Sequence, residues 1–253
     1  MYRYADYINE YRRIMQFNKN KELRIHRWYP FVEGYSKEFI ESIVNEQTQK
    51  VDLCLEPFSG SGTTALELST KGINCISFEV NPFMFTLSKA KLKVSLYKQR
   101  TIKSHILKMK KYIVSLDDDK INPYSRFSTL IEGEEKKKWN IDLEVFIAIE
   151  KLKTAIDSLS TILYKELYIV CLANILLEYS NLYRNGKCLS YKKGWKDNLY
   201  SQEQVITSFF NFINNIIIED LENLETNNFS NHNLLFLGDA RKLSFENVDD
   251  DLI

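Results

Sequence analysis

The sequence EPFSGSG, from Glu56 to Gly62, stands between a short apolar run and a segment with helical periodicity. The apolar run VDLCLE (51–56) predicts a buried strand, and TTALELSTKG (63–72) predicts a helix that ends at its glycine. A second strand-like run, INCISFE (73–79), follows at once. Strand, glycine turn, helix and strand within about thirty residues form one βαβ unit. The chain is therefore expected to build an α/β sheet with the glycine turn at its ligand-binding edge.

The residues around this turn indicate the charge of the ligand. Gly60, Gly62 and Ala65 fit the G-x-G-x-x-G/A pattern of dinucleotide sites, and Glu79 follows Gly60 by nineteen residues. However, Glu56 at the end of the first strand would repel a pyrophosphate and attract an ammonium or a sulfonium, by several kcal/mol at about 4 Å. We therefore expect S-adenosylmethionine, with Glu79 accepting both ribose hydroxyls. A tight turn that needs glycine only for its positive φ is the alternative without a ligand.

Composition limits the remaining possibilities. Lys+Arg and Asp+Glu are equal at 34 each, so nucleic-acid binding would depend on local patches rather than on net charge. No stretch approaches the ~20 uncharged apolar residues of a membrane span, and the charged N-terminal segment does not resemble a signal peptide, so we expect a cytoplasmic protein. We expect neither a disulfide nor a metal site, because no C-x-x-C pair and no ligand-spaced histidines occur among Cys54, Cys75, Cys171, Cys188, His105 and His232.

Helical periodicity dominates the rest of the chain. We expect a third strand at 233–237, loops at 24–36, 117–132 and 181–198, and helices at 2–18, 37–49, 82–116, 134–158, 161–180 and 202–225. This order predicts three parts. Residues 1–92 hold an N-terminal helix and a cofactor-binding βαβ unit, 93–230 form a helical insertion, and 231–253 return to the sheet.

The run EPFSGSGTT followed by FEVNP resembles the amino-group DNA methyltransferases, which modify exocyclic nitrogens of adenine or cytosine. Their first motif reads D/E-P-F-x-G-x-G-T, and their second strand ends in an acidic residue that is commonly followed by N-P. The resemblance implies a Rossmann-like S-adenosylmethionine-dependent methyltransferase fold, here with an incomplete sheet and a large helical insertion. It also implies that the cofactor is bound by Glu56, Pro57, Phe58, Gly60, Gly62, Thr63, Glu79 and Asn81.

Two further stretches extend the resemblance. The aromatic segment with His26, Trp28 and Pro30 looks like the one that helps the family hold the methionine end of the cofactor. For His26, a hydrogen-bonded structural role is an equal alternative. The segment LFLGDARKL is similar to the family's third motif, which implies that Asp239 reaches the adenine amino group and that Ala240 borders the ring.

The family's catalytic motif, D/N/S-P-P-Y/F, is not found in the sequence. Its first side chain and a proline-constrained carbonyl accept hydrogen bonds from the target amine, and its aromatic residue stacks on a flipped base. The segment NPYS (122–125) has one proline and no strand before it. We therefore assign no catalytic residue and expect one half of a split enzyme, completed by a second polypeptide with the catalytic motif and the remaining strands. A truncated reading frame is the equal alternative.

Cations and aromatic residues are mixed in YRNGKCLSYKKGWK (183–196). Cations suit phosphates and aromatic rings suit unstacked bases, so this stretch predicts DNA contacts. The residues we expect to bind DNA are Arg184, Lys187, Tyr191, Lys192 and Lys193. A solvated loop is the alternative.

Together these features predict the S-adenosylmethionine-binding portion of a site-specific DNA methyltransferase of a modification system, acting on adenine N6 or cytosine N4 and inactive as this chain alone. The alternatives are a non-catalytic cofactor- or partner-binding remnant, an RNA methyltransferase subunit and a dinucleotide oxidoreductase. Glu56 argues against the last of these, because its carboxylate would face a pyrophosphate.

Overall fold

The computed structural model describes residues 11–12, 14–31, 33–121, 130–133, 136–186, 188–224 and 233–242. The chain divides into two compact units, each treated separately below. The first, here called the sheet unit, comprises Met1–Leu96 and Asn223–Ile253. The second, the helical unit, comprises Tyr97–Glu222.

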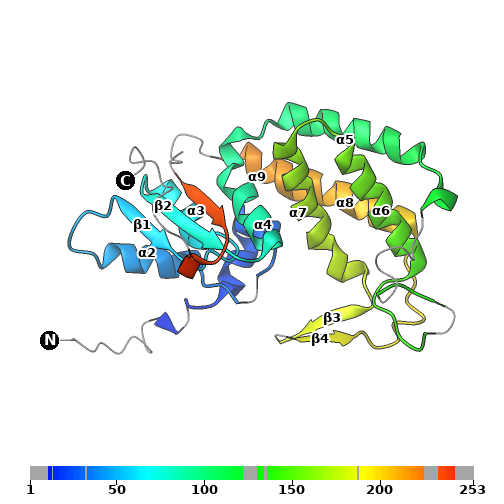
Figure 1. Ribbon diagram of the computed structural model, residues 1–253, viewed down its shortest axis with the longest axis horizontal. Helices are drawn as coiled ribbons and strands as arrows, with labels where there is room; N and C mark the ends of the chain where they lie inside the picture. Colours follow the sequence, from blue (N-terminus) through cyan, green and yellow to red (C-terminus); the bar gives the residue numbers. More distant parts are fainter. Residues whose placement is uncertain are drawn as a thin grey trace. The chain divides into compact units, whose positions relative to one another are not determined.

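The sheet unit is built on a small parallel sheet (Figure 1). Its strands are β1 (Leu53–Glu56), β2 (Asn74–Glu79) and β5 (Leu234–Leu237), in the order β1-β2-β5. Glu56 lies opposite Ser77, and Glu79 lies opposite Leu237, so the three carboxyl ends meet at one edge. The three predicted strands are confirmed, and their parallel pairing is consistent with an α/β methyltransferase fold.

Three helices cover this sheet: α2 (Lys37–Asn45), α3 (Thr63–Thr70) and α4 (Pro82–Leu92). Helix α3 contacts both other helices as well as β2, and its apolar side chains join a core with Ile40 of α2 and Cys75 of β2. Ser36 caps α2, since its Oγ accepts a hydrogen bond from the Phe39 amide at 3.2 Å. This packing fixes the position of the first residues of α3, which directly follow the glycine turn.

The expected single helix over 82–116 is wrong. The chain forms α4, a short 3-10 turn (Val94–Leu96) and a separate helix α5 (Gln99–Val114). Val94 and Tyr97 are buried at this break, and the Lys98 amide donates to the Tyr164 hydroxyl at 3.0 Å. No glycine or proline marks the break, so periodicity alone runs through it. Tertiary packing therefore ends α4 where the sheet unit ends.

The helical unit packs α5 with α6 (Leu143–Asp157), α7 (Ile162–Tyr179) and α8 (Gln202–Phe212). Helix α8 continues through a π-helical turn (Ile213–Ile218) into α9 (Glu219–Glu222), which confirms one helical segment near 202–225. Helix α7 agrees with the prediction, whereas α6 begins at residue 143 rather than at 134. The core includes Ile102, Leu152, Tyr168, Phe209 and Ile213, each fully buried.

The expected loop at 181–198 is also wrong in its first half. Residues Leu182–Asn185 (β3) and Cys188–Tyr191 (β4) form an antiparallel hairpin (Figure 1). Asn185 lies opposite Cys188, and Gly186, directly after β3, has a φ of 60°. A glycine that directly follows a strand and shortly precedes another is a hairpin signal, because the first turn position of a type II′ hairpin needs positive φ. The predicted loop did not take this signal into account.

At the N-terminus, residues 2–10 of the expected helix lie outside the described residues, and Phe17–Glu22 forms a 3-10 helix. The expected loop at 24–36 contains a further 3-10 turn, His26–Trp28. Among the described residues, no helix has the length and apolar character needed to cross a bilayer.

The capping box of α8 gives a test of the helical unit. Ser201 Oγ accepts from the Gln204 amide at 3.2 Å, and Gln204 Oε1 accepts from the Ser201 amide at 2.8 Å. We expect Ser201→Ala to lower the free energy of unfolding by about 1 kcal/mol, because one amide at the helix start loses its acceptor. Urea unfolding followed by circular dichroism measures this. Ser104→Ala, at an exposed position inside α5, is the control, and equal losses in both variants would contradict the role of the cap.

Candidate functional site

Three acidic residues lie where the parallel strands end. Glu56 is the last residue of β1, Glu79 is the last of β2, and Asp239 follows β5 by two positions. The Gly238 amide donates to the Glu79 carbonyl at 2.9 Å, which holds the chain after β5 beside the end of β2. Ligands of α/β sheets bind at this edge. The arrangement therefore places an acidic site next to the glycine turn.

The Glu56 carboxylate is held by three donors from three segments. Its Oε1 accepts from the Phe58 amide at 3.0 Å, and its Oε2 accepts from Tyr35 Oη at 2.8 Å and from Thr64 Oγ1 at 2.7 Å. Burial and the Glu56 charge raise the pKa of Tyr35, so its phenol remains a donor. These contacts fix the direction of the carboxylate before any ligand arrives.

Tyr35 and Thr64 are functional positions that the sequence analysis missed. Tyr35 precedes the cap of α2 and Thr64 lies in the first turn of α3, so they meet Glu56 only because α2 packs on α3. The chain has 15 tyrosines, and no local pattern separates this one from the others. Thr64 carries a weak sequence signal for this contact. It lies eight positions after Glu56, at the start of the next helix, where its hydroxyl can turn back toward the end of the strand.

Glu79 and Asn81 organise the end of β2. Glu79 Oε2 accepts from the Gly60 amide at 2.7 Å and Oε1 accepts from the Asn81 amide at 2.8 Å. A carboxylate has about four acceptor positions, so both oxygens keep room for a hydroxyl donor. Asn81 Oδ1 caps α4 by accepting from the amides of Phe83 and Met84. Asn81 thus sets the direction of α4, while Glu79 ties the glycine turn to β2.

Both glycines of the turn are structurally required. Gly60 has a φ of 52° and Gly62 a φ of 78°, in the left-handed region that favours glycine. A Cβ on Gly62 would lie 2.8 Å from Ser88 Oγ, and one on Gly60 would lie 3.0 Å from the Phe31 ring. Ser88 Oγ in turn donates to the Gly60 carbonyl at 2.9 Å. Thr63, which is buried, then opens α3.

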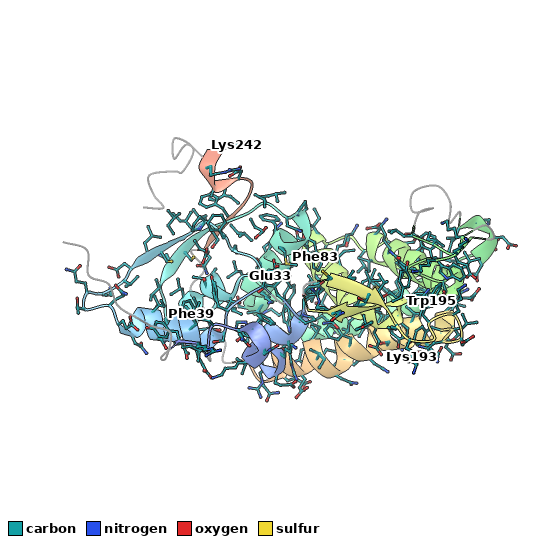
Figure 2. All side chains as sticks on the ribbon, turned by 90° about the horizontal axis from the view of Figure 1, so that it is seen from below. Glu33, Phe39, Phe83, Lys193, Trp195 and Lys242 are labelled. Atoms are coloured by element: carbon teal, nitrogen blue, oxygen red, sulfur yellow. The ribbon has the colours of Figure 1, made fainter. Side chains whose placement is uncertain are left out.

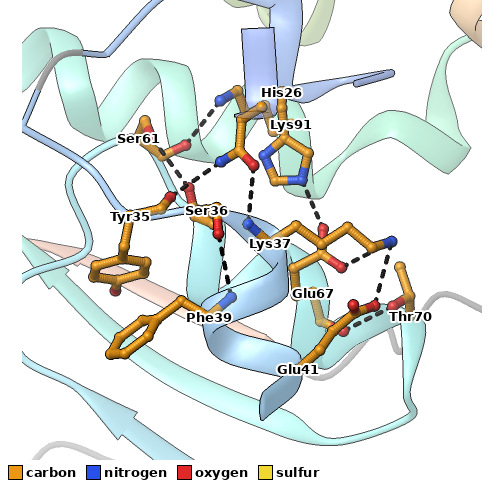
Figure 3. A network of polar contacts seen from close by, with 12 residues as sticks. His26, Tyr35, Ser36, Lys37, Phe39, Glu41, Ser61, Glu67, Thr70 and Lys91 are labelled. Carbon is orange, nitrogen blue, oxygen red and sulfur yellow. Dashed lines mark hydrogen bonds and ion pairs between the residues drawn. The ribbon is translucent and has the colours of Figure 1, made fainter. Parts of the chain in front are cut away.

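A buried lysine supports the turn from behind. Lys91 of α4 is fully buried, and its Nζ donates to the Ser61 carbonyl at 3.1 Å (Figure 3). Burial lowers the pKa of Lys91 to about 7. The nearest aromatic ring is that of Phe17, whose centroid lies 5.9 Å from Nζ. The lysine therefore gives the turn carbonyl a donor at the cost of desolvating an amine.

His26 belongs to a second polar cluster on α3 (Figure 3). Its Nε2 lies 2.6 Å from Glu67 Oε1, and Glu67 Oε2 lies 3.1 Å from Lys37 Nζ. Burial lowers the pKa of His26 and outweighs the bond to Glu67, so the ring is neutral and donates through Nε2. For Glu67, the contacts with His26 and Lys37 outweigh burial and lower its pKa. In the part of the chain that the structure describes, His26 thus bonds to Glu67 of α3 and not to Glu56 or Glu79.

The remaining predicted cofactor residues differ in exposure. Trp28 is fully buried and Pro30 is exposed. Pro57 is exposed, and Phe58 retains 80% of its accessible surface next to Glu56. Asp239 accepts from the guanidinium of Arg241 at 2.6 and 2.9 Å, and these bonds hold its pKa well below the usual range. Ala240 opens a 3-10 turn after it. Their assignment to the cofactor stays a prediction.

The predicted DNA-binding residues belong to the helical unit. Arg184 lies on β3, Tyr191 ends β4, and Lys193 is exposed just beyond it. Lys192 Nζ donates to the Glu178 carbonyl at 2.5 Å. Lys187 lies outside the described residues. Among the described residues, no group of three or more His, Cys, Asp or Glu is arranged to hold a metal ion.

Two effects would oppose a side chain at Gly62: its left-handed backbone and the close approach of Ser88. Comparison with Gly72 separates them. Gly72 has a similar φ of 70°, but a Cβ there would meet nothing within 4 Å. Both Gly62→Ala and Gly72→Ala should lose about 1 kcal/mol of stability through the left-handed backbone. Gly62→Ala should lose a further 1–3 kcal/mol, roughly, through the clash with Ser88. Urea unfolding of both variants gives the difference, and equal losses would show that the turn has room for a side chain.

Lys91 predicts a pH dependence of stability. The unfolded chain keeps the lysine proton up to its ordinary pKa of 10.5, whereas the folded protein releases it near pH 7. Unfolding therefore takes up a proton between these values, and stability should rise with pH by up to about 1.4 kcal/mol per unit. Lys91→Met should lack this contribution, while Lys89→Met on the same helix should keep it. Unfolding free energies at pH 7, 8 and 9 test this, and parallel curves for wild type and Lys91→Met would contradict it.

Comparisons with known proteins agree with this geometry. Residues 6–90 match a family described as DNA methylase. The chain is 38% identical over 72 residues to the type II methyltransferase M.BsoBI of Geobacillus stearothermophilus, covering 28% of this chain and 14% of that protein. It is 27% identical over 126 residues to the type II methyltransferase M.MjaII of Methanocaldococcus jannaschii, covering 49% of this chain and 23% of that protein. It is 32% identical over 72 residues to the type II methyltransferase M.AvaI of Nostoc sp., covering 28% of this chain and 15% of that protein.

The matched region thus spans less than a quarter of each of these three relatives. No solved structure matches the chain. The matched family region includes the strand-end acids Glu56 and Glu79 and the glycine turn between them. This part of the chain is therefore similar to DNA methylases, in agreement with the resemblance of its motifs to the amino-group DNA methyltransferases.

Proposed function

We propose that the chain binds S-adenosylmethionine at the acidic edge of its sheet and serves as the cofactor-binding portion of a DNA methyltransferase acting on adenine N6 or cytosine N4. The observation that carries this proposal is the Glu56 carboxylate, which is held in place by Tyr35, Thr64 and the Phe58 amide. Its relatives named above are type II methyltransferases, which supports a role in a modification system.

The charge of the site favours a cationic nucleoside. The hydrogen-bond partners of Glu56 and Glu79 are neutral amides and hydroxyls, and neither acid has an ion-pair partner among the described residues. An ammonium or sulfonium about 4 Å from one such carboxylate gains about 4 kcal/mol at a surface-like dielectric, and a phosphate would lose as much. A dinucleotide is therefore disfavoured at this edge.

The rest of the site suits the nucleoside. Glu79 retains acceptor positions for two ribose hydroxyls, and the glycine turn leaves no side chain between backbone and ligand. Phe58 and Val80, 80% and 65% exposed, adjoin the two acids in sequence and offer apolar surface for the adenine ring. Asp239 and Ala240, after β5, lie on the same edge beside Glu79. His26 bonds to Glu67 of α3, and we propose that Trp28 and Pro30 lie with it near the methionine end of the cofactor.

When bound, S-adenosylmethionine supplies a methyl group, which leaves sulfur and bonds to the exocyclic nitrogen while that nitrogen loses a proton. The residues of this chain bind and orient the donor, and none of them is assigned to the proton transfer. Positioning of donor and acceptor accounts for most of the rate in such a transfer.

The sheet itself supports a role for a second polypeptide. β1 lies at the outside of the described sheet, with Leu53 and Leu55 exposed by 41% and 54%. An apolar strand with a free edge is a template for another strand. We propose that this strand belongs to a second polypeptide, which also brings the catalytic motif and the remaining strands.

Glu56→Gln tests the proposed cofactor. Gln keeps the size of the side chain, and the hydroxyls of Tyr35 and Thr64 can rotate to accept from its amide, so the fold should persist. We expect titration calorimetry to show S-adenosylmethionine binding at least tenfold weaker, because the attraction to the cationic tail is lost. Glu46→Gln, which removes an exposed carboxylate at the end of α2, is the control. Wild-type protein that binds a nicotinamide dinucleotide but not S-adenosylmethionine would refute the proposal.

A further inference from the structure

The β3–β4 hairpin and the residues directly after it carry a group of positive charges with no acid among them in sequence. Between Leu182 and Lys196 there is no Asp or Glu, and the cations are Arg184, Lys187, Lys192, Lys193 and Lys196. The side chains of Arg184 and Lys193 have no ion-pair or hydrogen-bond partner in the part of the chain that the structure describes. Unpaired cations on a protruding element are free to meet phosphates.

The hairpin is fixed at its base. Asn181, nearly fully buried, donates from Nδ2 to Asp142 Oδ1 at 2.9 Å, and its backbone amide donates to the Asn140 carbonyl at 2.8 Å. The Lys192 amide closes the other strand by donating to the Asn181 carbonyl at 2.9 Å. Tyr191 Oη donates to Asn140 Oδ1 at 2.9 Å. These bonds anchor both strands to the segment before α6, so the hairpin presents its charges from a rigid base.

Aromatic rings and lysines surround this base. Trp195 packs edge-on against Trp139 with ring centroids 4.8 Å apart, and its centroid is 5.3 Å from that of Tyr191. Lys196 Nζ lies 5.5 and 5.7 Å from the two indole centroids, and Lys138 Nζ lies 5.3 Å from Tyr191. Cation–π contacts hold these ammonium groups at the surface without neutralising them. Figure 2 marks Trp195 and Lys193 beside the hairpin.

Strand register places Arg184 and Tyr191 on one face of the hairpin. Leu182 lies opposite Tyr191, and Arg184 lies opposite Leu189. Because cross-strand partners share a face and alternate residues repeat it, Arg184 and Tyr191 belong to the same face of the ribbon. This face runs from the aromatic base to the tip. Tyr183 and Leu189, 43% and 54% exposed, leave the ribbon uncovered on both faces.

We propose that the β3–β4 hairpin enters the major groove of duplex DNA, with Arg184 facing the groove and Lys193 and Lys196 on the flanking phosphates. A two-stranded ribbon fits the major groove of B-form DNA, about 12 Å wide. The major groove of A-form RNA is too deep and narrow for it, so duplex RNA is disfavoured. The inference rests on the proposed function, since the similarity of residues 6–90 to DNA methylases is the reason to expect a DNA duplex.

The test measures binding of the full chain to a short fluorescent DNA duplex by anisotropy, between roughly 50 and 200 mM salt. Arg184→Ala with Lys193→Ala should weaken binding at least tenfold at the lowest salt. It should also reduce the slope of log K against log salt by about 0.9, because Lys193 is the phosphate contact of the two residues. Both side chains lack partners among the described residues, so the variant should fold, with unchanged tryptophan emission as the check.

The control is Lys103→Ala with Lys111→Ala, which removes two exposed charges from α5 and should keep the wild-type affinity and slope. Equal losses in both double variants would attribute binding to overall charge and overturn the inference. So would a wild-type chain that does not bind DNA at low salt, or a duplex RNA that competes as well as DNA. Calorimetry with S-adenosylmethionine on the same protein separates these outcomes: cofactor binding with an indifferent hairpin refutes only the hairpin, whereas loss of cofactor binding refutes the proposed function.

Discussion

The candidate site depends on the hydrogen bonds of one carboxylate. Glu56 joins the end of β1 to Tyr35 before α2, to Thr64 in α3 and to its own turn at Phe58. A carboxylate without these donors would adopt many rotamers and point away from the sheet edge. With them its charge is directed before any ligand binds, which reduces the ordering that binding must cost. The remaining site residues are arranged around this fixed charge.

The support behind the glycine turn is polar rather than apolar. Lys91 bonds to Ser61, and His26 bonds to Glu67 on α3, both in buried surroundings. Such groups contribute little net stability compared with apolar packing, but an unsatisfied partner would be costly. These bonds therefore act mainly on position: they favour the placement of α3 and its turn in which Lys91 reaches Ser61 and His26 reaches Glu67. A rigid turn suits a site that must hold its ligand close to the backbone.

Local chemistry accounts for much of what was predicted. The apolar runs ending in Glu56 and Glu79, with glycines between them, predict β1, β2 and the turn, because buried strands and positive-φ turns have few alternative sequences. Helix α7 was predicted for similar reasons. The break between α4 and α5 was not, since its cause is the burial of Val94 and Tyr97 rather than a local breaker. The hairpin carried a local signal at Gly186, which the mixture of cations and aromatic residues around it obscured.

The sequence by itself determined the similarity to DNA methylases, the glycine turn and the acids at two strand ends, because these are properties of neighbouring residues. Only the tertiary structure decided which groups hold them. Tyr35 reaches Glu56 across 21 positions, Lys91 reaches Ser61 across 30, and His26 pairs with Glu67 across 41. The tertiary structure also showed that β5 pairs in parallel with β2. Contacts between distant segments depend on how helices pack on the sheet, and that packing has no signature in any short stretch of sequence.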